Sequence, residues 1–548
     1  MLNCVRSLPR KAVLKISQLG MNVGFRRHGM TTKKALVLFF FLAVLAGQAF
    51  SQDKEVLSLS LEDCVAKALK NNLSLAVEIY NPEIAQATLA RTKEIFMPRF
   101  DLNYGTQRQE NPPYWFIQGA GTLVTTNQDY GLTIVQQVPT GANISLSLSG
   151  YRSDTNQAYQ LINPRYGSTL RMDLRQPLLR NFGLTVNRQQ IIIARNNLGI
   201  SLDQLKTNIL STIYLVEETY WNLVYAIENY KVKQQSLQLA KDLLAKNRRE
   251  VDVGTLAPIE ILNAEATVAS READILQAES LILRGEEVLK NIINLAAEGP
   301  TGAKKLVPAD KPVFKERPVS RETALNDALM KRPDLQGLKK DLDTRQLNVS
   351  VARNQMLPNL DLQFSLWSPG ISGDRLLYAG DNPFSGVLVG KEKGSGSDSI
   401  RDSLKFRYQN WSVGLTLSLP LSNLLTKADF VGAKLALEQD QARYKTLEQQ
   451  ARLEVSDAVR EIETNVKRVQ AYRIARELAE KRLDAEQKKL GVGLTTNYFV
   501  LQYQEELANA RSLEIKSLVD YNLSLARLDK AAGTSLETRN IQIGDFLK

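Results

Sequence analysis

The sequence is nearly devoid of histidine and cysteine. Its 548 residues include one histidine, His28, and two cysteines, Cys4 and Cys64. His28 and Cys4 lie in an N-terminal stretch that we expect to be removed, so the mature chain would have no imidazole and a single thiol. This excludes histidine-based catalysis, Ser-His-Asp triads, histidine-ligated metal sites and an intramolecular disulfide. Because no phosphate-binding loop is found either, we predict no catalytic residue, no cofactor and no metal site, and a protein that is not an enzyme.

Acidic residues are missing from the first 51 positions. The chain has a formal net charge of +11, and eight Lys or Arg residues, without a single acid, lie in residues 1–51. The rest of the chain therefore carries a net charge of only +3. This near balance excludes the extended basic surface that a nucleic-acid partner would need, so we predict no nucleic-acid binding.

The basic N-terminal stretch has the organisation of a secretory signal. Lys33 and Lys34 precede the apolar run Ala35–Gly47, and the small residues Ala49 and Ser51 fit the −3 and −1 positions of a cleavage site. The run has 13 residues, which is short for a membrane-spanning helix, so a membrane anchor is the weaker alternative. We assign residues 1–51 to a signal peptide, with Met21 and Met30 as alternative starts.

The mature sequence contains an internal repeat. Residues 59–104 and 319–364 share a pattern in which Pro98 aligns with Pro358. After each copy come a zone of strand character, a long helical zone, a glycine and a second helical zone, so a duplicated unit is the economical interpretation. The predicted organisation is a first repeat over residues 55–300, a linker or equatorial segment over 301–318, a second repeat over 319–533 and a C-terminal tail over 534–548.

Four segments alternate strictly between apolar and polar residues, which predicts strands with one face of each kind. They span residues 99–107, 168–177, 359–367 and 410–419. Their polar faces carry charges, which suits a water-filled lumen better than a packed core, and their lengths approach the ~9–11 residues of a membrane strand. A sandwich strand with one solvated face is the alternative. The candidate lumen-facing residues are Arg99, Asp101, Arg171, Asp173, Arg175 and Gln363.

Two further regions separate these strands. Residues 132–138 and 143–150 alternate and flank residues 139–142, which are typical of a hairpin turn. The pattern leaves open whether this hairpin joins the membrane strands or extends from their rim. The stretch Ser368–Asp402 is rich in glycine and serine and is predicted as a long surface loop.

The helical zones repeat apolar residues at a mean spacing of about 3.5 residues, the period of a coiled coil. Uninterrupted helices over 189–249 and 427–490 would each be roughly 90 Å long, too long for a compact domain. We therefore expect two projecting antiparallel helical hairpins, over residues 185–297 and 425–532. Charge-rich stretches such as Glu477–Lys489 are predicted to be solvated faces of these hairpins.

Four strands cannot close a barrel by themselves, because the smallest single-chain membrane barrels have about eight strands and open edges are not viable in lipid. The strands of several subunits must then be pooled, and three subunits would supply about twelve. The predicted fold class is a mixed α+β membrane protein, internally duplicated. Its long antiparallel coiled-coil helices would form a periplasmic α-barrel, and about four strands per subunit would contribute to a shared trimeric β-barrel.

Several features resemble the TolC-type outer membrane efflux protein family, also called outer membrane factors. They are the segment Gln176–Gly183 leaving a strand, the repeat, and the glycine breaks at Gly254 and Gly493. The resemblance covers nearly all of residues 55–535. It implies a homotrimeric channel-tunnel in the outer membrane of a Gram-negative bacterium, extending into the periplasm. Its partners would be a periplasmic adaptor (membrane fusion) protein, an inner-membrane pump and outer-membrane lipid. Its function would be that of a passive conduit in tripartite efflux or type I secretion. An exported coiled-coil structural or adhesion protein is the alternative, but it does not explain the paired alternating strands.

The resemblance also implies two candidate sites. The family turns between antiparallel helices at a periplasmic tip that meets the adaptor, and glycine there allows the positive φ that ends a helix. The matching residues here are Val253, Gly254, Thr255, Val492, Gly493 and Leu494. The family often places pore-constricting acids just beyond the turn, so Glu260 and Asn263 are candidate periplasmic gate residues. The second repeat has Phe499 in place of the acid, and a solvated acid favoured by the helix dipole is the alternative for Glu260.

Overall fold

The computed structural model describes residues 56–295 and 304–542. The predicted signal peptide, residues 301–303 of the predicted linker and residues 543–548 of the predicted tail lie outside them. The α-helices are α2 (Leu61–Asn71), α3 (Leu73–Lys93), α4 (Leu184–Asn187), α5 (Gln189–Asp252), α6 (Ile259–Ile292), α7 (Arg321–Lys331), α8 (Pro333–Gln355), α9 (Gly396–Leu404), α10 (Leu424–Gly491), α11 (Asn497–Ala532) and α12 (Ser535–Thr538). The strands are β1 (Val56–Leu59), β2 (Arg99–Asn111), β3 (Leu123–Gln137), β4 (Asn143–Thr155), β5 (Ile162–Pro177), β6 (Lys305–Pro308), β7 (Asn359–Tyr378), β8 (Leu388–Glu392) and β9 (Asn410–Ser418).

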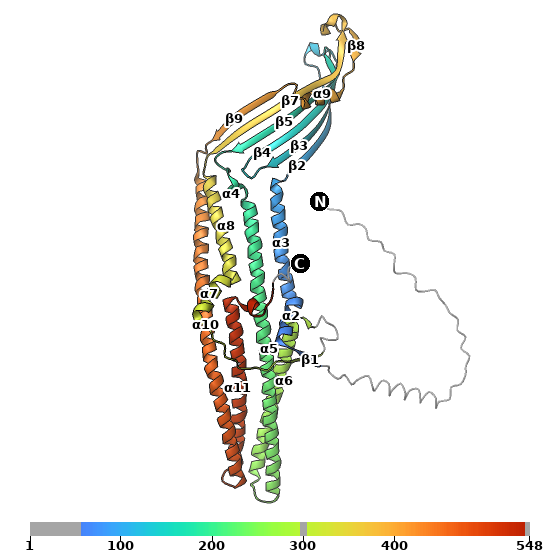
Figure 1. The fold of residues 1–548 in the computed structure, drawn as a ribbon. Coiled ribbons are helices and arrows are strands. Elements are labelled where there is room, and N and C mark those ends of the chain that lie inside the picture. The colour runs from blue at the N-terminus through green and yellow to red at the C-terminus, as the bar shows by residue number, and fades with distance from the viewer. Residues whose placement is uncertain (1–55, 296–303, 543–548) are drawn as a thin grey trace, which may run out of the picture. The chain divides into compact units, whose positions relative to one another are not determined.

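Seven strands form one antiparallel sheet (Figure 1). Their order is β2-β3-β4-β5-β7, and β8 and β9 both pair with β7. The expectation of about four strands is therefore wrong. The hairpin of β3 and β4, whose place the sequence left open, lies inside the sheet between β2 and β5. The hairpin fits there because apolar and polar residues alternate in the same phase in β3 and β4 as in β2 and β5. The apolar side chains of all four strands therefore lie on one face of the sheet.

The stretch 368–402 is not the long surface loop that was predicted. β7 continues to Tyr378, β8 follows, and α9 packs against β5 and β7. Small residues permit this contact, since a Cβ added at Gly370 would lie 1.9 Å from the carbonyl oxygen of Ser399. Ser168 and Ser403 are fully or almost fully buried, with their hydroxyl oxygens 3.1 Å apart. The composition that suggested a loop thus reflects the close approach of a helix to a sheet.

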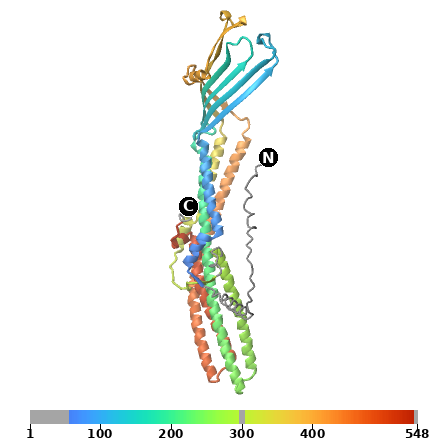
Figure 2. The same cartoon turned by 90° about the vertical axis from the view of Figure 1, so that its right-hand side faces the viewer.

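Two hairpins, each built on one long helix, carry most of the helical structure. α5 has 64 residues and α10 has 68, and each folds back antiparallel on a shorter helix, α6 or α11. At 1.5 Å per residue they are about 96 and about 102 Å long. In both views the two hairpins run side by side and end in turns away from the sheet (Figures 1 and 2). The α5 stripe that the heptad spacing predicted is buried, as Ile209, Ile213, Val216, Tyr220 and Leu223 show.

Short elements join the two halves of the chain beside these hairpins. Residues 309–320 have no regular structure and are held by tyrosines from two long helices. Tyr220 of α5 donates to Asp310 at 2.7 Å, and Tyr521 of α11 donates to the Lys315 carbonyl at 2.8 Å. Among the residues that the structure describes, no helix combines the length and the apolar character needed to cross a membrane.

The C-terminal segment returns to α5. Arg539, just after α12, pairs with Glu217 at 2.5 Å. Burial raises the pKa of Glu217, and the charge and hydrogen bond of Arg539 act in the opposite direction. A buried carboxylate without such a partner would be costly, so this ion pair fixes the tail to the helical region.

Candidate functional site

One face of the sheet is apolar from edge to edge. Leu102 of β2 is paired with Leu132, Leu132 with Leu148 and Leu148 with Leu170, so four strands place leucines side by side. We call this face the apolar belt. It also includes Phe100, Ile134, Leu146, Met172, Leu174, Phe364, Leu366, Trp411, Val413 and Leu415. Leu102 is 82 % exposed and Leu415 is 64 % exposed. A soluble monomer rarely exposes so large an apolar surface, so another apolar phase must cover it.

The opposite face of the sheet is polar. It carries all six residues predicted to face a lumen, namely Arg99, Asp101, Arg171, Asp173, Arg175 and Gln363. Arg171 pairs with Asp173 at 2.8 Å, and Asp173 accepts a 2.6 Å hydrogen bond from Ser365 of β7. Arg175 of β5 pairs with Asp361 of β7 at 2.7 Å. These charges lie in a row across neighbouring strands, and such a surface is stable against water but not against lipid.

Both long edges of the sheet are open. Within the described residues, β2 pairs only with β3, and β9 pairs only with β7. All of β2 and nearly all of β9 are exposed to solvent. Unpaired backbone groups at such an edge are a template for another strand, and in hydrocarbon each would have to be satisfied. The geometry therefore calls for a further strand at each edge.

The two helical hairpins end in the same backbone turn. In the first, the Gly254 amide donates to the Val251 carbonyl at 2.9 Å and the Thr255 amide donates to the Glu250 carbonyl at 2.8 Å. These two bonds define a Schellman motif. Gly254 has a φ of +77°, which an L side chain rarely adopts.

The second tip repeats this geometry at the predicted residues. The Gly493 amide donates to Leu490 at 3.1 Å, the Leu494 amide donates to Lys489 at 3.0 Å, and the φ of Gly493 is +75°. Val253, Val492 and Leu494 are each at least 70 % exposed. Each tip therefore presents an apolar side chain to solvent next to a glycine whose Cα has open space beside it.

The two candidate gate residues lie in the first turns of α6 but in different surroundings. Asn263 is exposed, whereas Glu260 is half-buried. The Glu260 carbonyl accepts a 3.3 Å hydrogen bond from the Asn247 amide of α5. One carboxylate oxygen of Glu260 is buried and has no hydrogen-bond partner among the described residues. Leaving a buried carboxylate oxygen without a hydrogen-bond partner is energetically costly.

A buried arginine, which the sequence reasoning missed, connects the two hairpins. Arg271 of α6 is 7 % exposed. Its guanidinium donates to the Ser236 carbonyl of α5 at 2.6 Å, and to Gln504 and the Leu501 carbonyl of α11 at 3.2 and 3.3 Å. Burial lowers the pKa of Arg271. Only its place on the inner side of α6 reveals this role, since an arginine in a charged helix reads from sequence as a solvated residue.

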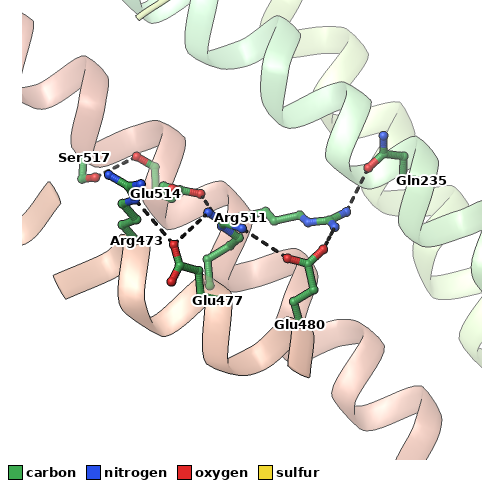
Figure 3. Close-up of polar contacts among 8 residues, drawn as sticks. Gln235, Arg473, Glu477, Glu480, Arg511, Glu514 and Ser517 are labelled. Carbon is green, nitrogen blue, oxygen red and sulfur yellow. Dashed lines mark hydrogen bonds and ion pairs between the residues drawn. The ribbon is translucent and has the colours of Figure 1, made fainter. Parts of the chain in front are cut away.

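A second connection between the hairpins involves more exposed residues. Arg511 of α11 pairs with Glu480 of α10 at 3.0 Å and donates to Gln235 of α5 at 3.1 Å (Figure 3). Arg476 pairs with both Glu480 and Glu514, which ties α10 to α11.

The prediction that Glu477–Lys489 is a solvated face is wrong for part of this stretch. Glu486 is 8 % exposed and accepts a 2.5 Å hydrogen bond from the Thr495 hydroxyl. The reason is that α10 turns this residue toward the turn that follows it, where a hydroxyl satisfies the carboxylate.

The fold and these surfaces define a class: proteins that combine an open sheet, apolar on one face and polar on the other, with two long helical hairpins. Comparison with known sequences agrees. The family model for outer membrane efflux proteins matches residues 125–295 and 324–534. The chain belongs to this family, and it is a protein of the outer membrane that extends into the periplasm.

Individual relatives have low sequence identity to this chain, but the matches cover most of each chain. The outer membrane protein TolC of Vibrio cholerae is 24 % identical over 345 residues, which are 61 % of this chain and 70 % of that protein. The alkaline protease secretion protein AprF of Pseudomonas aeruginosa is 23 % identical over 386 residues, which are 67 % and 69 % of the two chains. Among solved structures, the Campylobacter jejuni CmeC outer membrane channel matches with a TM-score of 0.60 at 17 % identity, covering 96 % of this chain and 99 % of that one. The outer-membrane channel OprN matches with a TM-score of 0.61 at 17 % identity, covering 87 % and 90 %.

Proposed function

We propose that three copies of this chain form a passive conduit from the periplasm to the cell exterior, as the outer-membrane component of a tripartite efflux or type I secretion system. The observation that carries the proposal is the two-faced sheet with two open edges. Pairing β2 of one subunit with β9 of the next satisfies both edges and closes the sheet into a barrel. The apolar belt then contacts lipid, and the row of Arg and Asp residues lines water.

The number of strands differs from the sequence expectation. Six long strands per subunit, β2 to β5, β7 and β9, give a barrel of about eighteen strands instead of about twelve. Barrel diameter grows roughly linearly with strand number, and barrels of about 16–18 strands leave an aqueous channel. Four helices per subunit, α5, α6, α10 and α11, would supply the twelve helices of a periplasmic tunnel. We further propose that the recurrence of α2–α3 and α7–α8, each before strands and a hairpin, reflects an internal duplication.

The hairpin tips are the proposed docking points for a periplasmic adaptor protein, which would link the conduit to an inner-membrane pump. The identical Schellman turns, each exposing apolar residues beside a glycine, support this role. Glu260 and Asn263 are proposed to contribute to a periplasmic gate. Their place at the start of α6, just beyond the tip turn, supports this proposal.

The alternative, an exported coiled-coil structural or adhesion protein, is not favoured. Such a filament would need the heptad helices but has no use for a sheet that is apolar on one face and charged on the other. Purification distinguishes the two functions. A filament would stay dissolved without detergent, whereas a protein that exposes the apolar belt would not.

The tip assignment is tested by replacing Gly254 and Gly493 together with valine. Both glycines have positive φ, so a β-branched residue strains the turn, and both Cβ positions point into open space, so the subunit core is untouched. We expect transport to be lost while the trimer still assembles. Gly432→Val is the matched control, since Gly432 lies inside α10 with equally open surroundings and no positive φ. Undiminished export in the double variant would show that the tips do not dock the adaptor.

A further inference from the structure

Helix α9 lies on the same face of the sheet as the apolar belt. Ser168, Leu170, Met172 and Leu174 point to one side of β5, because its pairing with β7 is regular from Arg165 to Pro177. Ser168 contacts Ser403 of α9. α9 therefore covers this face directly beyond Leu170, on the side farther from the helical hairpins.

Cationic side chains surround α9 at this level. Arg401 and Lys405 project from the side of α9 opposite its buried serines, and both are exposed. Lys405 has no ion-pair partner in the described part of the chain. Arg407 follows the helix, exposed and 5.8 Å from the ring of Tyr408. Trp411, which is 70 % exposed, then begins the apolar belt in β9.

Two other strands of the sheet, β4 next to β5 and β2 at the edge, add two arginines on the same face. Arg108 lies on β2 four residues beyond Tyr104, and Arg152 lies on β4 four residues beyond Leu148. Arg152 is paired in register with Tyr166, the residue that approaches Gly396 at the start of α9. We call these five residues the cationic collar: Arg108, Arg152, Arg401, Lys405 and Arg407.

The order along the sheet is thus apolar belt, then tyrosine and tryptophan, then cations. This is the order of a bilayer from its hydrocarbon core to its headgroups. A helix buried on one side through serines and charged on the other cannot sit in hydrocarbon, but it suits the headgroup region. Four of the five collar cations have one carboxylate partner each: Arg108, Arg152, Arg401 and Arg407. Lys405 is the one whose charge is not balanced by an ion pair among the described residues, and the paired guanidiniums remain partly exposed.

We propose that α9 and the cationic collar bind phosphate-bearing lipid headgroups of the outer leaflet and thereby set the depth of the subunit in the membrane. The proposal rests on the proposed function, since it requires the apolar belt to lie in the bilayer. Arginine pairs with phosphate through charge-assisted, bidentate hydrogen bonds, and lysine through its point charge. The surface therefore prefers lipids whose phosphates carry a net negative charge, such as lipid A, to zwitterionic phospholipids, in which a cation on the headgroup balances the phosphate.

Depth is measured with a fluorescent probe on single cysteines, introduced into the mature full-length protein reconstituted in phosphatidylcholine vesicles that contain lipid A. Cys64 has no exposed area and will not react. With Lys405→Cys we expect quenching by a nitroxide on the lipid headgroup. Leu415→Cys should be quenched by a nitroxide on the acyl chain, and Val389→Cys in β8 only by a water-soluble quencher.

The three positions separate the possible failures. Suppose that the acyl-chain nitroxide quenches the probe at 415, while only the water-soluble quencher reaches the probe at 405. The collar proposal is then wrong, but the apolar belt still lies in the bilayer. If the probe at 415 also reports water, the proposed function itself is wrong.

Lipid selectivity is tested by neutralising α9. For the triple variant Arg401→Gln, Lys405→Gln and Arg407→Gln, we expect at least a threefold loss of lipid A retained per trimer after purification. The control removes the same charge from exposed positions on α10 that form no ion pair within the described residues: Lys467→Gln, Arg468→Gln and Lys481→Gln. If both triple variants retain equal amounts of lipid A, the proposal is overturned. If the control retains as much lipid A as the unaltered protein and the α9 variant retains less, the proposal is supported.

Discussion

Arg271 shows how one residue can connect two elements that the sequence treats as independent. A guanidinium has five donors, and Arg271 directs its donors to acceptors on α5 and α11. No carboxylate of the described residues forms an ion pair with it. Its burial is tolerated because carbonyl and amide oxygens replace water. Movement of the first hairpin relative to the second would break these bonds.

We expect Arg271→Ala to loosen the contact between the hairpins. Loss of hydrogen bonds to a charged donor costs roughly 1.5–3 kcal/mol, and the removed side chain leaves a cavity. Hydrogen exchange at the start of α11 should accelerate accordingly. Arg271→Met fills the same space without donors, so an equal effect of both variants assigns the loss to hydrogen bonding. Unchanged exchange in both would mean that Arg271 does not hold the hairpins together.

Cys64 offers a second test at the residue scale. Burial is the main cause that raises the pKa of its thiol to about 12, from an ordinary value of 9.0. Only the thiolate reacts with iodoacetamide, so at pH 8 the folded protein should be alkylated roughly a thousandfold more slowly than the unfolded protein. Mass spectrometry with and without denaturant measures this difference. Similar rates in the two states would contradict the burial of Cys64 in the core beside α5.

At the scale of the element, the sheet has one apolar and one polar face because adjacent residues of each strand point in opposite directions. In β9, Leu415 is paired with Leu362 on the apolar face, and Thr416 is paired with Asp361 on the polar face. The two positions are neighbours in sequence and equally close to the sheet edge. They therefore form a matched pair for testing which face meets lipid.

We expect Leu415→Arg to impair membrane insertion and Thr416→Arg to be tolerated. A charge on the lipid face near the bilayer midplane costs about 2–4 kcal/mol, whereas a charge facing a wet lumen costs little. The amount of folded protein in outer-membrane fractions reports the difference. If Thr416→Arg is the more damaging change, the assignment of the two faces must be reversed.

At the scale of the whole molecule, a single chain is incomplete. Its sheet has two open edges, its apolar belt is uncovered, and one carboxylate oxygen at the tip lacks a partner among the described residues. In the proposed trimer, strand pairing between neighbouring subunits would satisfy the two edges, and lipid would cover the apolar belt. The energetics of the subunit and of the assembly would then be inseparable, as for many obligate oligomers.

Disulfide crosslinking tests the closure between subunits. A cysteine at Asn103 of β2 is combined in turn with one at Ser412, Gly414 or Thr416 of β9, all on the polar face. In at least one combination we expect covalent trimers under denaturing conditions. A control pair that uses Ser147 of the interior strand β4 in place of Asn103 should give none. If no edge combination crosslinks, β2 and β9 do not meet.

The sequence alone determined the parts and their faces. Alternation with period two assigned Arg171, Asp173 and Gln363 to one side, and the heptad spacing located the buried stripe of α5, because both patterns are local properties of a strand or a helix. Glycine also marked both tips, since α5 and α10 each end there with a residue of positive φ.

Only the tertiary structure decided how the parts combine. The insertion of β3 and β4 between β2 and β5 depends on which backbone edges pair, and any strand of the right phase could have taken that place. The packing of α9 against the sheet depends on contacts between Ser399, Ser403 and Gly370. These are small residues, and their local sequence pattern is typical of a loop. Arg271 is buried because a neighbouring hairpin covers it. Hydrogen-bond partners and close contacts between distant segments are set by three-dimensional proximity, which no local period encodes.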